Sequence, residues 1–410
     1  FFIFKSSASK MPPKKKKGGE ESERVPLLGR STNNVGMGIV GMPNVGKSTF
    51  FNTLSKLHVP AENYAFCTKD PNVAKVPVKD KRFDKLVAAF APKSVKPAVL
   101  TVTDIAGLVR GAAEGAGLGN EFLSHIRATD AIYHMVRAFE DKDISHVEES
   151  VDPIRDMDII ENELRAKDLE GMVNYVEKEA KNVARGIGGK EKKFEFDTFV
   201  KVKELLESGK DVRSARWSAK ETPIINTKQF LTAKPMIYLV NLKADSYVKK
   251  RSNWLPKILA YVEERGLGEP VIPVSAAYES MIVDAELAGP EEVAKIVAEN
   301  DGVESLLPKV IKLGYKTLNM QSFFTCGPDE VRQWSIRKGF TAPEAAGTIH
   351  GDFQKCFISA DIYKFKDWNK AGGTREAEAA VKAAGKLKTE GKKYIMQDGD
   401  ICFFKHNASK

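Results

Sequence analysis

Eight consecutive residues carry the clearest chemistry of this 410-residue chain. Gly41-Met-Pro-Asn-Val-Gly-Lys-Ser48 matches G-x-x-x-x-G-K-S, the P-loop pattern. Its glycines let backbone N–H groups close around phosphates, and a helix that begins there adds positive potential. Lys47 is expected to reach the β- and γ-phosphates, and the Ser48 hydroxyl is expected to bind Mg²⁺. The stretch predicts a site for a nucleoside triphosphate.

A second motif follows about 60 residues later, at a spacing that suits a P-loop protein. Asp104-Ile-Ala-Gly107 fits D-x-x-G, in which Asp104 would hold a Mg²⁺-bound water and the Gly107 N–H would point at the γ-phosphate. Thr68 lies between the two motifs, where a threonine can close over the γ-phosphate and give Mg²⁺ a second hydroxyl. The alternative for Thr68 is an ordinary loop threonine.

The residue after D-x-x-G differs from that of many GTPases. They carry there a glutamine that orients the attacking water, whereas this chain has Leu108, which cannot hydrogen-bond to water. Either another group positions the water or turnover is slow. His146 is one candidate, because a neutral imidazole can orient water or accept its proton. A surface or core histidine is the other interpretation.

Base selection depends on a tetrad that follows a strand. GTPases read guanine with N-K-x-D, but counting from the apolar run 235–241 gives Asn241-Leu-Lys-Ala244, with alanine in place of the carboxylate. Guanine donors left unpaired cost on the order of 1–3 kcal/mol, and adenine lacks the 2-amino group. The competing register, Leu242-Lys-Ala-Asp245, restores Lys and Asp but loses Asn. Ser275-Ala-Ala277 fits the S-A-x segment that approaches the base.

Strands and helices in alternation must hold these residues. Residues 49–56 are helix-compatible, and apolar β-prone runs predict strands at 35–40, 99–104, 235–241 and 270–275. Strands separated by helical segments predict an α/β fold with a mostly parallel, doubly wound sheet. Ligands bind at the carboxyl ends of such strands, so we expect one edge to gather the P-loop, Asp104, Asn241 and Ser275.

Two further parts interrupt or follow this pattern. Apolar residues recur at helical spacing on both sides of Gly186-Ile-Gly-Gly189, which predicts an antiparallel helical hairpin. The apolar residues of the hairpin either pack its two helices against each other or form a surface that binds a partner. After Pro308, short strands and a helix at 376–387 predict a separate α+β module. The expected domains are a disordered basic tail (1–33), a P-loop domain (34–150 and 222–304), a hairpin insertion (151–221) and a C-terminal module (305–407).

Composition excludes several classes of protein. The chain is 42% apolar and 29% charged, and no run approaches the roughly 20 apolar residues of a membrane span. Four scattered cysteines without a C-x-x-C pair argue against zinc or disulfides and fit a reducing compartment. The net charge of +9 and the basic run 14–17 favour polyanionic partners. We expect Met11 to be the native start and residues 1–10 to be non-native.

Further motifs lie in a fixed order along the chain. They are Phe-Cys-Thr-Lys-Asp-Pro-Asn (66–72), Asp-Ile-Ala-Gly-Leu-Val (104–109), Asn-Glu-Phe-Leu-Ser-His-Ile (120–126) and Val-Asp-Pro-Ile-Arg-Asp (151–156). With the P-loop they resemble the Obg-like ATPases, the YchF subfamily of Obg-related P-loop proteins in its eukaryotic form. Segments 323–332 and 398–405 look like that family's TGS domain, a β-grasp module. The resemblance runs from about residue 36 to residue 407.

The resemblance implies a set of site residues. It implies hydrolysis of ATP in preference to GTP and adenine read by the backbone at Leu242. His146 occupies the position proposed to replace the glutamine, which gives Lys47, Gly107 and His146 as the catalytic set. Mg²⁺ would be bound by Ser48, Thr68 and Asp104. The phosphates would be contacted by Asn44, Val45, Gly46, Lys47, Ser48 and Thr49.

The resemblance also implies cofactors and partners. Asn44 matches the P-loop asparagine linked to K⁺ stimulation in related GTPases, so K⁺ is a candidate second cation. Members are cytosolic, associate with ribosomes, and place the hairpin and TGS domain around a basic cleft. We therefore expect a cytoplasmic monomer that binds the ribosome (large subunit), RNA or both, and neither a membrane nor DNA.

The chain departs from the family pattern at two positions of interest. Ala244 stands where a glutamate is usual, and Glu149 stands where a glycine is usual. Two other functions remain open. One is a GTPase that uses the register ending at Asp245, and the other is a ribosome-binding protein in which nucleotide only stabilises the fold. Leu108 is the feature that keeps the second of these open.

Overall fold

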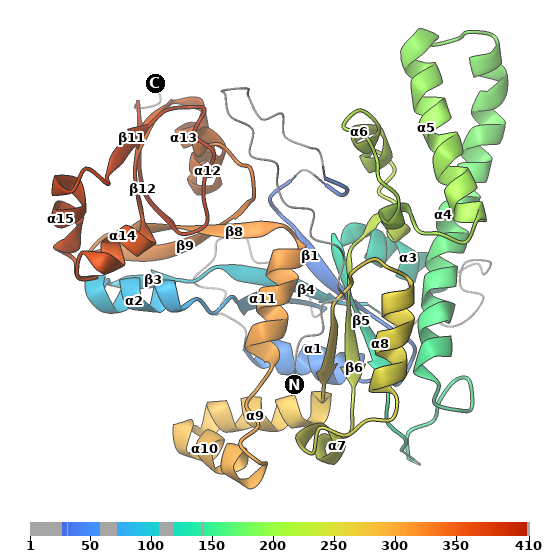
Figure 1. Ribbon diagram of the computed structural model, residues 1–410, viewed down its shortest axis with the longest axis horizontal. Helices are drawn as coiled ribbons and strands as arrows, with labels where there is room; N and C mark the ends of the chain where they lie inside the picture. The colour runs from blue at the N-terminus through green and yellow to red at the C-terminus, as the bar shows by residue number, and fades with distance from the viewer. Residues whose placement is uncertain (1–26, 31, 58–71, 106–117, 142, 408–410) are drawn as a thin grey trace. The chain divides into compact units, whose positions relative to one another are not determined.

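Six strands form the sheet that the P-loop pattern predicts (Figure 1). Their order is β2-β4-β1-β5-β6-β7, and β1–β5, β5–β6 and β6–β7 pair in parallel. The central strands are almost entirely buried, as continuous apolar runs in a parallel sheet require. The bounds are β1 (Gly36–Val40), β2 (Val73–Pro77), β4 (Val99–Asp104), β5 (Ala131–Arg137), β6 (Met236–Asn241) and β7 (Val271–Val274).

The computed structural model describes residues 27–30, 32–57, 72–105, 118–141 and 143–407, and these fall into two compact units. The first holds the described parts of Phe1–Lys56, Asp70–Ala74 and Val102–Leu307. The second holds the described parts of Leu57–Lys69, Lys75–Thr101 and Pro308–Lys410. Sequence patterns did not anticipate that Lys75–Thr101 groups with the C-terminal residues. The predicted domain boundaries otherwise stay predictions.

Helices of the first unit pack on its sheet and on one another. Helix α1 (Lys47–Lys56) begins inside the P-loop and contacts α9 (Ala276–Ala288), and α8 (Leu255–Glu264) contacts β7. The remaining elements are α3 (Leu118–Ala128), α6 (Glu221–Asn226), α7 (Ala244–Val248), α10 (Pro290–Glu299) and the 3₁₀ turns η2 (Val212–Ser214) and η3 (Leu231–Ala233). The predicted α/β architecture of a P-loop protein is confirmed.

The predicted helical hairpin is formed by α4 (Pro153–Ala184) and α5 (Gly189–Glu207), which run side by side in Figure 1. The start of helix α4 is stabilised because the Asp152 carboxylate accepts hydrogen bonds from two backbone N–H groups and a proline follows at the first helical position. The turn needs glycine, since Gly188 has φ 84°. The Tyr175 and Phe199 rings meet in the seam with centroids 4.8 Å apart.

A second six-stranded sheet forms the core of the other unit. Its order is β11-β10-β12-β8-β9-β3, with β12–β8 and β3–β9 parallel and the remaining pairs antiparallel. The strands are β3 (Ser94–Lys96), β8 (Met320–Cys326), β9 (Glu330–Arg337), β10 (Phe357–Lys364), β11 (Lys388–Glu390) and β12 (Asp400–His406). The helices are α2 (Lys81–Phe90), α11 (Leu307–Thr317), α12 (Ala342–Ile349), α13 (Gly351–Lys355), α14 (Phe365–Lys370) and α15 (Ala377–Ala383).

Apolar side chains cover both faces of this second sheet. Phe323 packs in a cluster with α12, whereas its neighbour Phe324 packs in another with Phe83 of α2 and Trp368 of α14. This alternation is the period of two expected of a strand. The predicted strands near 323, 357 and 402 are confirmed. The helix predicted over 376–387 is wrong in length: α15 ends at Ala383, and Gly385 has φ 66°.

Candidate functional site

A cavity of about 620 Å³ opens beside the P-loop. Its walls come from the P-loop and from the segments that follow β5, β6 and β7, so the predicted gathering at strand ends is present. The P-loop side consists of Asn44, Gly46, Lys47, Ser48 and Thr49. The opposite side consists of Phe139, Asp141, Ile144, Asn241, Leu242, Lys243, Ala244, Ala276 and Ala277.

One glycine, Gly46, and one asparagine, Asn241, hold the P-loop against the end of β6. Gly46 has φ 98°, and a Cβ built there would lie 2.4 Å from Asn241 Nδ2, so only glycine fits. Asn241 Nδ2 donates to the Val45 carbonyl at 2.9 Å, and Asn241 Oδ1 accepts from the Ala276 N–H at 3.0 Å. Asn241 therefore joins the phosphate side of the cavity to its other side through main-chain contacts.

Lys47 lies at the start of α1 with its side chain folded over the loop. Its Nζ donates to the Met42 carbonyl at 2.7 Å, and the residue is 7% exposed. Burial lowers the pKa of Lys47 to about 8, against the opposing charge of Asp104. A cation held in low dielectric interacts more strongly with an incoming anion than a solvated one does.

Ser48 and Asp104 supply oxygen ligands at the same place. Ser48 Oγ donates to Asp104 Oδ2 at 3.2 Å, while Asp104 Oδ1 is buried and has no hydrogen-bond partner among the described residues. Burial raises the pKa of Asp104, and the Ser48 hydrogen bond and Lys47 oppose it. A buried carboxylate oxygen without a partner suits Mg²⁺ or a Mg²⁺-bound water, so the donor set fits this ion. The other predicted residues, Thr68 and Gly107, lie outside the described residues.

The base side of the cavity ends in alanine. Strand β6 ends at Asn241, and the residues from Asn241 to Ala244 line the cavity, whereas Asp245 is exposed and does not. The Leu242 N–H donates to the Val274 carbonyl at 2.8 Å as part of the sheet. Any main-chain contact from Leu242 to a base would therefore have to come from the Leu242 carbonyl oxygen, which is an acceptor.

Ser275 holds the base segment from behind. It is completely buried, and its Oγ accepts from the Tyr278 N–H as the N-cap of α9. Its neighbours Ala276 and Ala277 line the cavity, and Ser275 itself does not. The prediction that Ser275 contacts nucleotide is therefore not supported by its placement, because its hydroxyl is committed to the helix.

His146 lies behind the loop that follows β5. Its Nε2 lies 2.9 Å from Asp156 Oδ2 of α4, and its Nδ1 accepts from the Glu148 N–H at 3.1 Å. This pairing requires the neutral tautomer with the proton on Nε2. Its side chain is only 4% exposed, and it does not line the cavity. The prediction that His146 orients water stays a prediction. Both of its ring nitrogens have protein partners in this structure.

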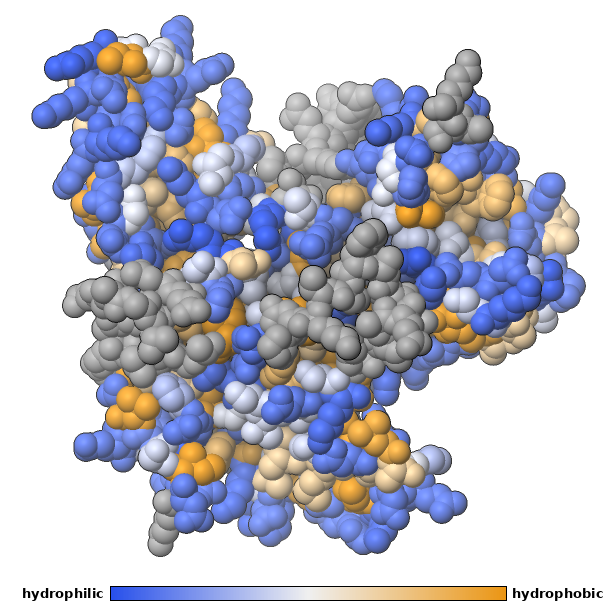
Figure 2. Space-filling model, turned by 180° about the vertical axis from the view of Figure 1, so that it is seen from behind, coloured by the Kyte–Doolittle hydropathy of each residue, from blue (hydrophilic) through white to orange (hydrophobic). Residues whose placement is uncertain are grey.

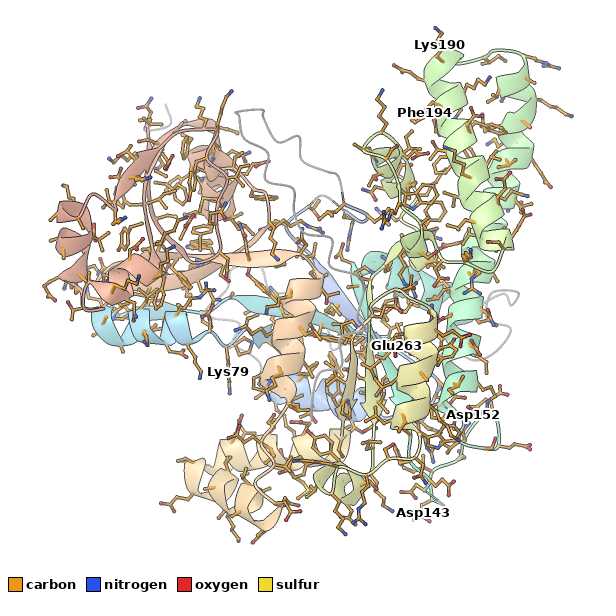
Figure 3. The ribbon with its side chains drawn as sticks, in the orientation of Figure 1. Lys79, Asp143, Asp152, Lys190, Phe194 and Glu263 are labelled. Atoms are coloured by element: carbon orange, nitrogen blue, oxygen red, sulfur yellow. The ribbon has the colours of Figure 1, made fainter. Side chains whose placement is uncertain are left out.

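Sequence patterns missed the loop whose residues Phe139, Asp141 and Ile144 form part of the cavity wall. The available signal was the mostly apolar run of β5, Ala131–Arg137, which is wholly buried and ends at this edge. In Figure 3 Asp143 labels this loop, and Asp152 labels the start of α4. Among the residues that the structure describes, no group of His, Cys, Asp and Glu could hold a metal by itself, and no helix could span a membrane.

Comparison with known proteins places this geometry in a family. The family model described as "50S ribosome-binding GTPase" matches residues 36–181, and the YchF-GTPase C-terminal model, described as "Protein of unknown function (DUF933)", matches residues 320–407. "Obg-like ATPase 1" of Oryza sativa subsp. japonica is 52% identical over 97% of this chain and 99% of its own. The human "Obg-like ATPase 1" is 50% identical over 97% and 98%.

A solved structure agrees with these relatives. The Schizosaccharomyces pombe YchF GTPase is 47% identical, has a TM-score of 0.83, and is covered completely by 93% of this chain. The family predicted from the motifs is thereby confirmed, as is a P-loop domain followed by a TGS-like domain. With its P-loop, Asp104 and cavity in place, this chain belongs to the Obg-like ATPase family of P-loop nucleoside triphosphate hydrolases.

Proposed function

We propose that the protein hydrolyses ATP, and GTP less well, in a Mg²⁺-dependent site, and couples its nucleotide state to binding of the ribosome (large subunit) or RNA. The observation that carries the base preference is Ala244 at the position where a guanine-reading carboxylate would stand. The acceptor available nearby is the Leu242 carbonyl. A carbonyl favours the 6-amino group of adenine and repels the 6-oxo group of guanine.

The chain's own residues would do most of the chemistry by position and charge. Lys47 would leave the Met42 carbonyl for the β- and γ-phosphates, and the P-loop N–H groups from Asn44 to Thr49 would surround them. Ser48 and Asp104 would hold Mg²⁺, which neutralises phosphate charge when bound. Asn44 would serve a K⁺ ion, and comparing hydrolysis in KCl and NaCl tests that role.

His146 can orient water only if its ring leaves Asp156 and the Glu148 N–H. His146→Ala tests the prediction in single-turnover hydrolysis. A loss of about 10²-fold in rate would support water positioning, since general acid–base groups contribute about 10²–10⁴. A wild-type rate, together with lower stability at the N-terminal end of α4, would assign His146 a structural role in that helix.

The end of the hairpin supports a polyanionic partner. Residues 178–193, which we call the hairpin tip, contain six Lys or Arg and two Glu, whereas residues 153–177 of α4 contain three basic and seven acidic residues. Figure 3 labels Lys190 and Phe194 at this end, and in Figure 2 it is covered largely by hydrophilic side chains at upper left. Segregated positive charge on a projecting element suits phosphate backbones.

The tip's cations are available to a partner. Lys178, Lys181, Arg185, Lys190 and Lys193 are exposed and form no ion pair with any residue that the structure describes. Ile187 among them is 56% exposed and Phe194 beside them is 39% exposed, which adds surface for contact with RNA bases.

Two measurements test the proposed function. Calorimetric titration should give tighter binding of ATP than of GTP, and a tenfold preference for GTP, about 1.4 kcal/mol, would overturn the base argument. Co-sedimentation with ribosomes should weaken about tenfold or more in a variant with Lys181, Lys190 and Lys193 changed to Glu, with a smaller salt dependence. The matched control changes the exposed Lys249, Lys250 and Lys295 to Glu. Equal loss in both variants would remove the tip from the proposal.

A further inference from the structure

Arg137 is a buried cation at the edge of the sheet that the chemistry of the nucleotide site does not use. It is the last residue of β5, is 1% exposed, and pairs in register with Asn241 of β6. It forms no ion pair with any carboxylate in the described part of the chain. Arg213, another buried arginine of the same unit, instead pairs with Asp211 at 2.9 Å and Glu269 at 2.7 Å.

Within the described part of the chain, the Arg137 guanidinium donates only to main-chain carbonyls of one loop. Nε donates to the Phe139 carbonyl at 3.1 Å, and Nη2 donates to the Ile144 carbonyl at 3.1 Å and the Asp141 carbonyl at 3.4 Å. Nη1 donates to the Ser145 carbonyl at 3.4 Å. Its planar fork therefore fixes a loop at four points, which a lysine could not do.

The same loop forms a wall of the nucleotide cavity. Phe139, Asp141 and Ile144 line the cavity. The Phe139 ring also lies over the guanidinium, with 4.8 Å between Arg137 Cζ and the ring centroid. Asn44 of the P-loop reaches the loop as well, donating from Nδ2 to the Ser145 carbonyl at 3.3 Å. Arg137 thus lies behind the wall, and the wall contacts the P-loop.

Burying an arginine without an ion-paired carboxylate is costly, so its place calls for an explanation. The charge is offset here by the carbonyl dipoles that converge on it and by the nearby carboxylates of Asp141 and Asp156. An apolar side chain could fill the end of β5 without that cost, but it could not hold a loop whose own residues include exposed Glu140 and Asp143. The role of the cation is therefore to fix the conformation of the loop.

We propose that Arg137 is a positioning residue for nucleotide binding, which holds residues 139–141 and 143–145 in the conformation that forms the cavity wall and thereby sets affinity for the nucleoside triphosphate. This inference rests on the proposed function, in that the cavity must be the nucleotide site. It does not depend on the ribosome or on ATP over GTP. The physical basis is pre-organisation: apparent affinity falls in proportion to the fraction of molecules that hold the binding conformation.

The test compares Arg137→Lys and Arg137→Met with Arg213→Lys in the full chain. We expect KM for ATP, and the Kd of a non-hydrolysable ATP analogue, to rise about tenfold in both Arg137 variants, as a loop ordered one tenth of the time requires. At saturation kcat should stay within about threefold, because Lys47 and Ser48 are untouched. Arg213→Lys should lower the thermal midpoint without moving KM.

The KM readout separates positioning from folding. A residue that only stabilises the fold lowers the active fraction and hence apparent kcat, and leaves KM unchanged; that result for Arg137→Lys would overturn the proposal. If the Arg137 variants do not fold, a double variant with the exposed Glu140 and Asp143 changed to Gly loosens the loop instead. An unchanged KM there would also overturn it. A wild-type protein that binds no nucleotide would instead remove the proposed function.

Discussion

The two sides of the nucleotide cavity are built by different means. On the phosphate side each function belongs to a side chain or a glycine at a fixed spacing, as with Lys47, Ser48 and Gly46. On the proposed base side the wall consists of main chain, small apolar residues and the loop held by Arg137, and Ala244 stands where a guanine-reading carboxylate would be expected. Residue types at fixed spacing thus mark the proposed phosphate side, whereas backbone placement marks the proposed base side.

The largest effect should come from the phosphate side. Lys47→Ala should lower single-turnover hydrolysis by about 10²–10³, because it removes a preorganised donor and charge from the transferring phosphoryl group. Lys56→Ala, at the exposed far end of the same helix, is the control and should leave the rate unchanged. A Lys47→Ala rate within threefold of wild type would mean that this side does not work through its motif.

The base side should change specificity rather than rate. Ala244→Asp restores an acceptor and should raise the GTP-to-ATP affinity ratio about tenfold in calorimetric titrations, the scale of one or two recovered hydrogen bonds. Asp245→Ala is the matched control, and because Asp245 does not line the cavity it should move the ratio by less than twofold. A loss of GTP binding in Asp245→Ala would favour the other register and a GTPase.

Protonation of Lys47 links the phosphate side to pH. Its pKa in the free protein is lowered to about 8, and anionic phosphates favour the charged form. Binding should therefore take up a proton near pH 8, and affinity should be full below about pH 7 and fall several-fold as pH rises through 8 to 9. Calorimetry in two buffers with different ionisation enthalpies measures this uptake. Lys47→Gln should abolish it, and uptake that persists in that variant would assign the proton elsewhere.

The smallest effect should come from Glu149, which follows in sequence the loop that lines the base side. Glu149 has φ 60°, a left-handed conformation that favours glycine over residues with a Cβ. Glu149→Gly should raise the free energy of unfolding by up to about 1 kcal/mol, since relief of strain is partly offset by chain entropy. Denaturant unfolding measures the change, and KM for ATP should not move. A shift in KM would show that order in this segment reaches the cavity wall.

Most of the phosphate side could be predicted from the sequence. The P-loop pattern specifies backbone geometry as well as chemistry, so Lys47, Ser48 and Asp104 lie together as expected. The base side could be predicted only in outline. The strand ending at Asn241 was clear, but the role of Ser275 in capping α9 depends on helix geometry, and the bonds of His146 depend on where α4 begins.

Arg137 shows why the other residues of the site could not be predicted from the sequence. No motif marks it, because its partners are carbonyl groups, which every residue carries. Its role depends on the register of β5 against β6 and on where four carbonyl groups of the next eight residues lie. Strand β5 itself was missed since a short, wholly buried run of mostly apolar residues has no alternation to distinguish strand from helix.

The grouping of Lys75–Thr101 with the C-terminal residues has a consequence for biosynthesis. Phe83, Leu86 and Phe90 of α2 pack with Trp368, Tyr363 and Ile401, which are translated more than 200 residues later than Thr101. Their apolar surface stays uncovered while the intervening chain is made, so this unit can close only after Ile401 has been synthesised. For the same reason, expressing residues 305–410 alone would leave out a strand and a helix and produce a fragment prone to aggregate.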